Sequence, residues 1–354
     1  MLTDYEIYEP PYKGAHVYET DNLADTSGGV YPVFYCHTEN NKILASSSVT
    51  ALIHRFGNYV ENDRCKLTTG NYVSDNSSRD SRIFRLAPFH TVSGDYVITT
   101  VDVLNSIDRR RMITDTDILA LSVAENMINW IHSIEWAHPD YMNIVLTGGA
   151  DSQLILLVPK ENQSNWIAYS GEPNSSIVKQ FINDNHIQID FIADDGIDNE
   201  GIDIIHRKII ATDGLAGPAH LRYSIGLGSL IRKYNGKVII WMGTAGDVLN
   251  TGKLWKRKDI ITKDDYYRFL FNRVSHWQGS YHQMFKNMFD VSCLSAYHSP
   301  QIWRDAYLRM EPTILKGQDI RKRIGEILSQ CLRDKVVWPN KNPNPPLYNY
   351  QLKY

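Results

Sequence analysis

Cysteine is scarce in this sequence, and neither sign of charge is in large excess. The four cysteines (Cys36, Cys65, Cys293 and Cys331) are scattered and form no Cys-x-x-Cys pair. We therefore expect neither a zinc site of the usual spacing nor a disulfide framework, and we predict a reducing, cytoplasmic location. The formal net charge of −3 gives no general attraction to nucleic acid or to an anionic membrane.

Several familiar sequence patterns are also missing. No run of about 18 apolar residues is present, and the first residues are acidic, so we expect neither a membrane span nor a signal peptide. The sequence has no Gly-Lys-Ser/Thr of a Walker loop and no Gly-x-Ser-x-Gly nucleophile elbow. Walker-type nucleotide hydrolases and typical serine hydrolases are thereby excluded.

Hydrophobic residues make up 43% of the 354 residues and charged residues 22%, which is ordinary for a protein with a real core. This length allows two domains. Residues 1–112 are rich in short runs of aromatic and β-branched residues bounded by Gly, Asn, Asp and Ser. We predict a smaller β-rich N-terminal domain there, with strands at 31–35, 42–46 and 96–102, a hairpin turn at 39–42 and a helix at 50–56.

From residue 113 to 354 strands and helices alternate. This alternation predicts an α/β domain with a parallel sheet and helices on both faces. We expect strands at 142–147, 166–169, 187–192 and 238–242, and helices at 115–136, 152–158, 175–183, 219–234, 264–274, 301–310 and 317–332.

The segment after the strand at 142–147 has the composition of an anion-binding loop. It reads Thr147, Gly148, Gly149, Ala150, Asp151, Ser152. Loops at the carboxyl ends of parallel strands hold ligands, and free N–H groups at a helix start bind phosphate. The carboxylate of Asp151 would repel phosphate unless a cation lay between them, so the segment predicts Mg²⁺ as well.

A second loop of this kind follows the strand at 238–242. It reads Gly243, Thr244, Ala245, Gly246, Asp247. Alone it could be any turn between a strand and a helix. Together with the first loop it predicts a second contact with phosphate, with Asp247 as a further metal ligand.

These two loops carry a family resemblance. Residues 147–152 resemble the Ser-Gly-Gly-x-Asp-Ser pyrophosphate loop of the ATP pyrophosphatases, with Thr147 in place of the first Ser. Residues 243–248 look like a degenerate Thr-Gly-x-Gly-x-Asp-Glu segment of asparagine synthetases, in which Val248 replaces the Glu. The resemblance implies ATP and Mg²⁺ as cofactors, metal ligation by Asp151 and Asp247, and nucleotide contacts that extend to Gly171.

The resemblance extends to the N-terminal part. Asparagine synthetases and β-lactam synthetases begin with a β-rich domain, and in glutamine-using members a Cys after the initiator Met releases ammonia. Residue 2 is Leu here, and Phe89 replaces a family Gly after residues 85–88. The resemblance thus implies a degenerate glutamine-amidotransferase-like domain without glutaminase activity. Cys36 lies within an apolar run, which indicates a core residue rather than a substitute nucleophile.

The family also uses a late Lys, in a Lys-x-x-Leu-Arg segment, to stabilise charge at the reacting phosphorus. The matching region implies Lys316, but its spacing to Arg321 is one residue longer than in the pattern. Arg321 and Lys322 are the alternatives. His282 and His298 are further candidates for substrate contacts.

The expected function is that of a Mg²⁺-dependent synthetase. It adenylates a carboxylate of a small molecule or peptide, releases pyrophosphate, and joins the acyl group to an amine as an amide or lactam. Two alternatives stay open: a non-catalytic ATP-binding or interaction protein derived from such a synthetase, and a base-modifying ATP pyrophosphatase.

Overall fold

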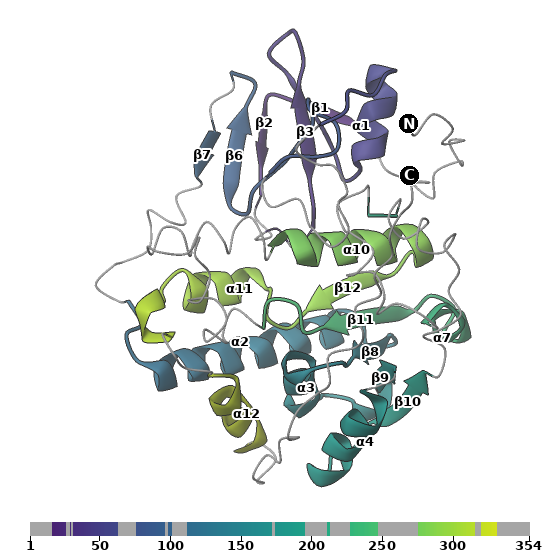
Figure 1. Ribbon diagram of the computed structural model, residues 1–354, viewed down its shortest axis with the longest axis vertical. Helices are drawn as coiled ribbons and strands as arrows, with labels where there is room; N and C mark the ends of the chain where they lie inside the picture. Colours follow the sequence, from purple (N-terminus) through teal and green to yellow (C-terminus); the bar gives the residue numbers. More distant parts are fainter. Residues whose placement is uncertain are drawn as a thin grey trace.

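A computed structural model of the chain describes residues 16–25, 29, 31–62, 76–95, 98–100, 112–171, 174–194, 211–212, 227–246, 275–315 and 320–330. Within these ranges the protein is an α/β structure, with a five-stranded parallel sheet flanked by helices and a separate region of small antiparallel sheets (Figure 1). No helix in the described ranges combines the length and apolar character needed to cross a membrane.

The parallel sheet has the strand order β10-β9-β8-β11-β12. Its strands are β8 (Met142–Leu146), β9 (Trp166–Gly171), β10 (Asp190–Asp194), β11 (Val238–Met242) and β12 (Ser292–Ser295), and all four neighbouring pairs are parallel. Along the chain, β8 is the first strand of this sheet. Strands β9 and β10 follow on one side of it, and β11 and β12 then lie on the other side. The direction of winding therefore reverses between β8 and β11. This confirms the predicted α/β class.

Alternate residues of the strands point to two separate cores. Val145 and Trp241 lie in the core covered by α2 (Thr116–Ala137), α3 (Ala150–Leu157), α4 (Ser175–Asp184) and α12 (Arg321–Gln330). Ile144 and Ile240 lie in the core covered by α7 (Leu227–Lys233) and α10 (Ser275–Phe289). Figure 1 shows α10 above the sheet and α2, α3, α4 and α12 below it. Strand periodicity of two thus explains why helices are needed on both faces.

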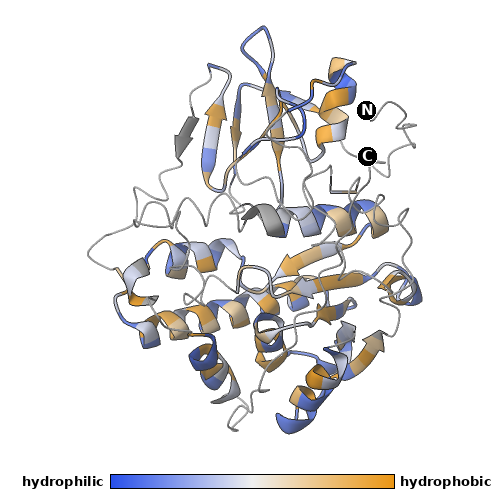
Figure 2. Cartoon of the chain, in the orientation of Figure 1, coloured by the Kyte–Doolittle hydropathy of each residue, from blue (hydrophilic) through white to orange (hydrophobic). Residues whose placement is uncertain are grey.

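The apolar colouring follows the same division, with the sheet strands mostly orange and the outer helical faces blue (Figure 2). The indole N–H of Trp241 donates to Asn143 Oδ1 at 2.8 Å inside the lower core, so the large ring is buried with its polar group satisfied.

The outer edge of β12 is covered by polar side chains. The Gln278 amide donates to Cys293 O at 2.8 Å, and His282 Nδ1 lies 3.1 Å from the same oxygen. Trp130 Nε1 donates to Ser295 O at 3.2 Å. An edge strand with its carbonyls occupied offers less of a template for pairing with another chain.

The N-terminal part confirms the predicted β-rich character. One antiparallel sheet has the order β1-β4-β3-β5, and a second has the order β2-β6-β7. Their strands are β1 (Tyr18–Thr20), β2 (Asn22–Ala24), β3 (Phe34–His37), β4 (Ile43–Ser46), β5 (Phe84–Arg85), β6 (His90–Ser93) and β7 (Ile98–Thr100). A core that includes Tyr35, Ile43 and Val92 joins the sheets, and α1 (Val49–Phe56) covers the other face of β3 and β4.

Helix α10 is shared between the two parts of the molecule. The Gln283 amide donates to Ser47 O at 3.1 Å, and the rings of Tyr31 and His282 meet edge to face with centroids 4.8 Å apart. The last described antiparallel strand ends at Thr100 and α2 begins at Thr116. The domain boundary between residues 112 and 113 stays a prediction.

Some predicted elements were wrong in position or type. The third parallel strand begins at Asp190 rather than 187, because α4 ends in a Schellman turn: His186 has a φ of 51° and Ile187 N bonds back to Ile182 O at 3.0 Å. The helix predicted at 301–310 is instead a short turn, α11 (Pro300–Ile302), followed by a π-helical segment, η8 (Trp303–Tyr307). Helix α10 and strand β12 were not predicted, and the helix predicted at 264–274 lies outside the described residues.

Candidate nucleotide-binding site

The two glycine loops lie next to each other. Strands β8 and β11 are neighbours in the sheet, and both loops leave it at its carboxyl edge. This is where the winding reverses, the place at which open α/β sheets bind ligands.

Direct packing between the loops explains two of the glycines. A Cβ on Gly246 would lie 2.6 Å from Asp151 Cβ, and a Cβ on Gly243 would lie 2.5 Å from Ser152 N. Neither position can hold a larger residue without displacing the first loop. Gly149 differs, because a Cβ built there meets no atom of the described residues within 4 Å. Open backbone of this kind, next to a helix amino end, allows close approach of an anion.

The first loop already binds an oxygen atom with its amides. The hydroxyl of Ser152 accepts from Gly148 N at 3.1 Å and from Gly149 N at 3.4 Å, and it donates to Gly149 O at 2.9 Å. Helix α3 starts at Ala150 with Gly149 as its N-cap residue, and the Ser152 hydroxyl caps this amino end by accepting from the Gly149 N–H. The same donors suit a phosphate oxygen.

Thr147 and Ser170 tie the start of the loop to strand β9. Thr147 Oγ1 donates to Tyr169 O at 3.2 Å, and Ser170 Oγ donates to Thr147 O at 2.7 Å. The Thr147 hydroxyl therefore serves the backbone of β9. Its predicted contact with nucleotide stays a prediction.

Asp151 is held by two segments far away in the sequence. Its carboxylate Oδ1 lies 2.7 Å from Arg321 Nη1, and its backbone carbonyl accepts from the Tyr297 hydroxyl at 2.7 Å. The side chains of Asp151 and Arg321 are 26% and 14% exposed. The start of α3, the connection after β12 and the start of α12 thus meet at this residue, as the adjacent α3 and α12 in Figure 1 indicate.

The second loop is a tight turn. Gly246 N donates to Gly243 O at 3.1 Å, and Ala245 has a φ of 75°, a conformation that costs a residue with a Cβ about 1 kcal/mol. The Ser295 hydroxyl donates to Thr244 O. Thr244 Oγ1 is buried and has no hydrogen-bond partner among the residues that the structure describes. Strained backbone of this kind gathers at functional sites.

The remaining predicted residues are placed only in part. Gly171 ends β9 at the same carboxyl edge, and its carbonyl accepts from Asn174 N at 3.1 Å. Asp247 and Lys316 lie outside the described residues. Within the described part of the chain, no group of three or more His, Cys, Asp or Glu side chains is arranged to hold a metal ion.

Two side chains that bond to the glycine loops were not predicted from the sequence. Ser295 and Tyr297 stand at the end of β12, so recognising that strand would have placed them at the carboxyl edge. The two histidines are buried, at 9% exposure for His282 and 1% for His298. Burial lowers the pKa of His282 to about 4, and its ring contacts the backbone of Cys293.

Cys36 is a core residue, as predicted. It is fully buried, and burial raises the pKa of its thiol to about 12, so the nucleophilic thiolate does not form near neutral pH.

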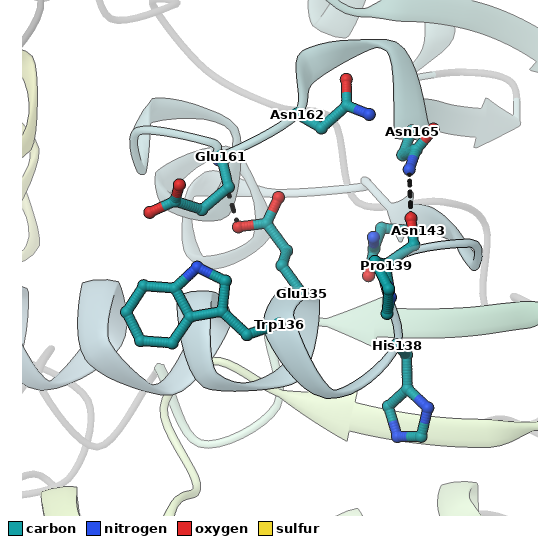
Figure 3. Close-up of a pocket in the computed structure, with 8 residues that line it drawn as sticks. All are labelled: Glu135, Trp136, His138, Pro139, Asn143, Glu161, Asn162 and Asn165. Carbon is teal, nitrogen blue, oxygen red and sulfur yellow. Dashed lines mark hydrogen bonds between the residues drawn. The ribbon is translucent and has the colours of Figure 1, made fainter.

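A pocket at the opposite edge of the sheet is a separate feature. Figure 3 shows this cavity of about 270 Å³, whose lining includes Trp136 and Asn143 near the amino ends of the strands. The carboxylate of Glu135 is already used there, since it accepts from Trp166 Nε1 at 2.7 Å and from Glu161 N at 3.3 Å. Because its lining lies at the amino ends of the strands and both glycine loops leave the carboxyl ends, this pocket is away from the loops.

Comparison with known proteins adds no family assignment: no family model matches this chain, and a search of curated proteins finds no match.

Proposed function

We propose that this protein is a Mg²⁺-dependent, ATP-consuming synthetase of the ATP pyrophosphatase type. It adenylates a substrate carboxylate and passes the acyl group to an amine, giving an amide or a lactam. Its N-terminal part is, in this proposal, a glutamine-amidotransferase-like domain without glutaminase activity, so the amine comes as ammonia, as an amino compound or from the substrate itself.

One observation carries the proposal. Loops 147–152 and 243–246 follow the two central strands at the reversal of the sheet, and Gly246 packs directly on Asp151. A carboxylate flanked by glycines and helix-end amides suits a metal that bridges phosphate groups better than it suits a bare anion.

Each residue of the two loops and of the start of α12 has a separate role in this proposal. In this proposal the N–H groups of Gly148 and Gly149, which donate to Ser152 Oγ in the structure, turn to the pyrophosphate part of ATP when it binds, and the described residues leave the space over Gly149 open to it. Asp151, together with Asp247, holds Mg²⁺, which when bound neutralises charge on the phosphates. Arg321, with Lys316, places positive charge near the reacting phosphorus.

The reaction then has two balanced steps. An oxygen of the substrate carboxylate forms a bond to the α-phosphorus of ATP as the bond to pyrophosphate breaks. The amine nitrogen next forms a bond to the acyl carbon, AMP leaves with the oxygen, and the amine loses a proton. Each half is easier than direct condensation, because AMP is a far better leaving group than hydroxide.

Release of pyrophosphate and AMP tests this function. Purified protein with ATP and Mg²⁺ is incubated with a panel of carboxylates and amines, and both products are quantified. We expect them in equal amounts with the correct acid. Asp151→Asn should reduce the rate at least about 100-fold, as loss of a group that stabilises transition-state charge does. Asp117→Asn is the matched control, since Asp117 also pairs with an arginine of α12, Arg323, at 2.8 Å.

A second candidate is a nucleotide-binding protein that no longer catalyses. The pairing of the Asp151 carboxylate with Arg321 favours it, because a carboxylate bound to a guanidinium is less free for a metal. This candidate predicts tight ATP binding without any pyrophosphate release, whereas the synthetase requires both.

A further inference from the structure

The ion pair between Arg321 and Asp151 sets a fixed positive charge beside the proposed nucleotide site. Arg321 is the first residue of α12, and this helix is anchored in the core by Ile320 and Ile324, which are 3% and 0% exposed. The guanidinium therefore reaches Asp151 from a firmly packed helix.

The position of this charge coincides with the predicted phosphate site. Asp151 is the second residue of α3, so Arg321 Nη1, which lies 2.7 Å from Asp151 Oδ1, stands beside the first turn of that helix. The amides of Gly148 and Gly149 are at the same helix end. A helix amino end carries partial positive charge of its own, and a guanidinium adds to it. The Asp151 carboxylate balances this charge in the structure described.

We propose that Arg321 and the metal ion compete for Asp151, and that the guanidinium transfers to the nucleotide phosphates once the metal takes the carboxylate. This inference rests on the proposed function and names the group that couples metal and nucleotide at its site. A guanidinium suits the second role because its planar donors match phosphate oxygens in pairs.

Competition of this kind has two reciprocal consequences. Removing Arg321 takes away the cation that pairs with the Asp151 carboxylate, so the metal alone should bind more tightly. Removing the charge of Asp151 takes away the anion that pairs with the Arg321 guanidinium, so nucleotide without metal should bind more tightly. We expect about tenfold in each case, or about 1.4 kcal/mol, for a partly buried charged pair.

The first measurement uses Mn²⁺ alone. Its affinity is determined from the electron paramagnetic resonance signal of free Mn²⁺ for the unmodified protein, Arg321→Gln, Arg321→Lys and Asp151→Asn. We expect about tenfold tighter binding in Arg321→Gln, little change in Arg321→Lys, which keeps the positive charge, and loss of binding in Asp151→Asn. Arg323→Gln is the matched control on α12 and should leave the affinity unchanged.

The second measurement uses α,β-methylene-ATP in EDTA, followed by calorimetric titration. Asp151→Asn should bind it about tenfold more tightly than the unmodified protein. The double variant with Arg321→Gln should lose that gain, which separates release of Arg321 from simple removal of a negative charge. Circular dichroism at the start of each titration confirms that every variant is folded, and Arg321→Met, which also removes the charge, replaces Arg321→Gln if that variant is not folded.

The outcomes separate the two proposals. Equal Mn²⁺ affinity in Arg321→Gln and the unmodified protein overturns the competition, as does an Asp151→Asn gain that persists in the double variant. Tighter Mn²⁺ binding in Arg321→Gln, with no binding of α,β-methylene-ATP in the presence of Mg²⁺ by any form, keeps the competition between Arg321 and the metal but overturns both the transfer to nucleotide and the proposed function.

Discussion

Replacing Gly246 by Ala should destabilise the protein through the contact between the two glycine loops. The added Cβ would lie 2.6 Å from Asp151 Cβ and 2.8 Å from Asp151 Oδ1. Carbon atoms prefer separations of about 3.5–4.0 Å, so the loops must move apart by about 1 Å. Overpacking of this size costs about 1–3 kcal/mol, offset in part by about 0.4–1 kcal/mol that Ala contributes through the unfolded chain. We expect a net loss of about 1–2 kcal/mol.

Gly149→Ala is the matched control in the first loop. Within the described part of the chain its added Cβ meets no atom within 4 Å, and a φ of −161° suits Ala. We expect a stability equal to or slightly above that of the unmodified protein, together with weaker nucleotide binding, because the methyl group fills the space that phosphate needs.

Urea unfolding followed by circular dichroism gives the free energies of both variants, and titration with Mg²⁺ and α,β-methylene-ATP gives their affinities. If Gly246→Ala is as stable as Gly149→Ala, the packing of the two loops is not as described. If Gly149→Ala binds nucleotide normally, the space over this residue is not the phosphate site.

Three further predictions concern buried polar groups. The pKa of His282 falls from 6.5 to about 4 on folding, so the unfolded chain binds more protons in this window and stability should fall by up to about 3 kcal/mol as pH drops from 6.5 to 4; His282→Asn should flatten this slope in urea unfolding at several pH values. Asn143→Leu leaves the indole N–H of Trp241 without its acceptor and should cost about 1–3 kcal/mol in the same assay, whereas adding Trp241→Phe should recover part of the loss. Tyr297→Phe removes the hydrogen bond to Asp151 O and should cost about 1 kcal/mol while lowering the affinity for Mg²⁺ and nucleotide; an unchanged affinity would show that this bond does not position Asp151.

The sequence predicted the centre of the fold better than its edges. Strands β8 and β11 are short, almost wholly apolar and followed by glycines, so the ends of both strands and the loops after them could be predicted. The edge strand β12 is only four residues long, Ser-Cys-Leu-Ser, and carries no such pattern. Its partner α10 was missed because polar residues such as Gln278 and His282 face inward to bond the edge of β12, which breaks the usual apolar stripe.

The candidate site was predictable where it is local in the sequence. Glycines, Asp151 and Ser152 occur within six consecutive residues, so the proposed anion-binding loop can be recognised from that segment alone. Tyr297 and Arg321 join the site only through tertiary packing of the β12 connection and of α12. No local pattern ties either residue to Asp151, although the family resemblance gave Arg321 as an alternative cation.

Hydrogen–deuterium exchange tests the central claim most directly, because it locates the nucleotide on the chain. Exchange of backbone amides is compared with and without Mg²⁺ and α,β-methylene-ATP, in the unmodified protein and in Asp151→Asn. We predict slower exchange in peptides that cover residues 147–153 and 243–246, with no change at residues 161–165 beside the pocket of Figure 3, and loss of the effect in Asp151→Asn. Protection confined to the pocket at the amino edge, or protection of the glycine loops that persists in Asp151→Asn, would contradict a metal-dependent nucleotide site at Asp151.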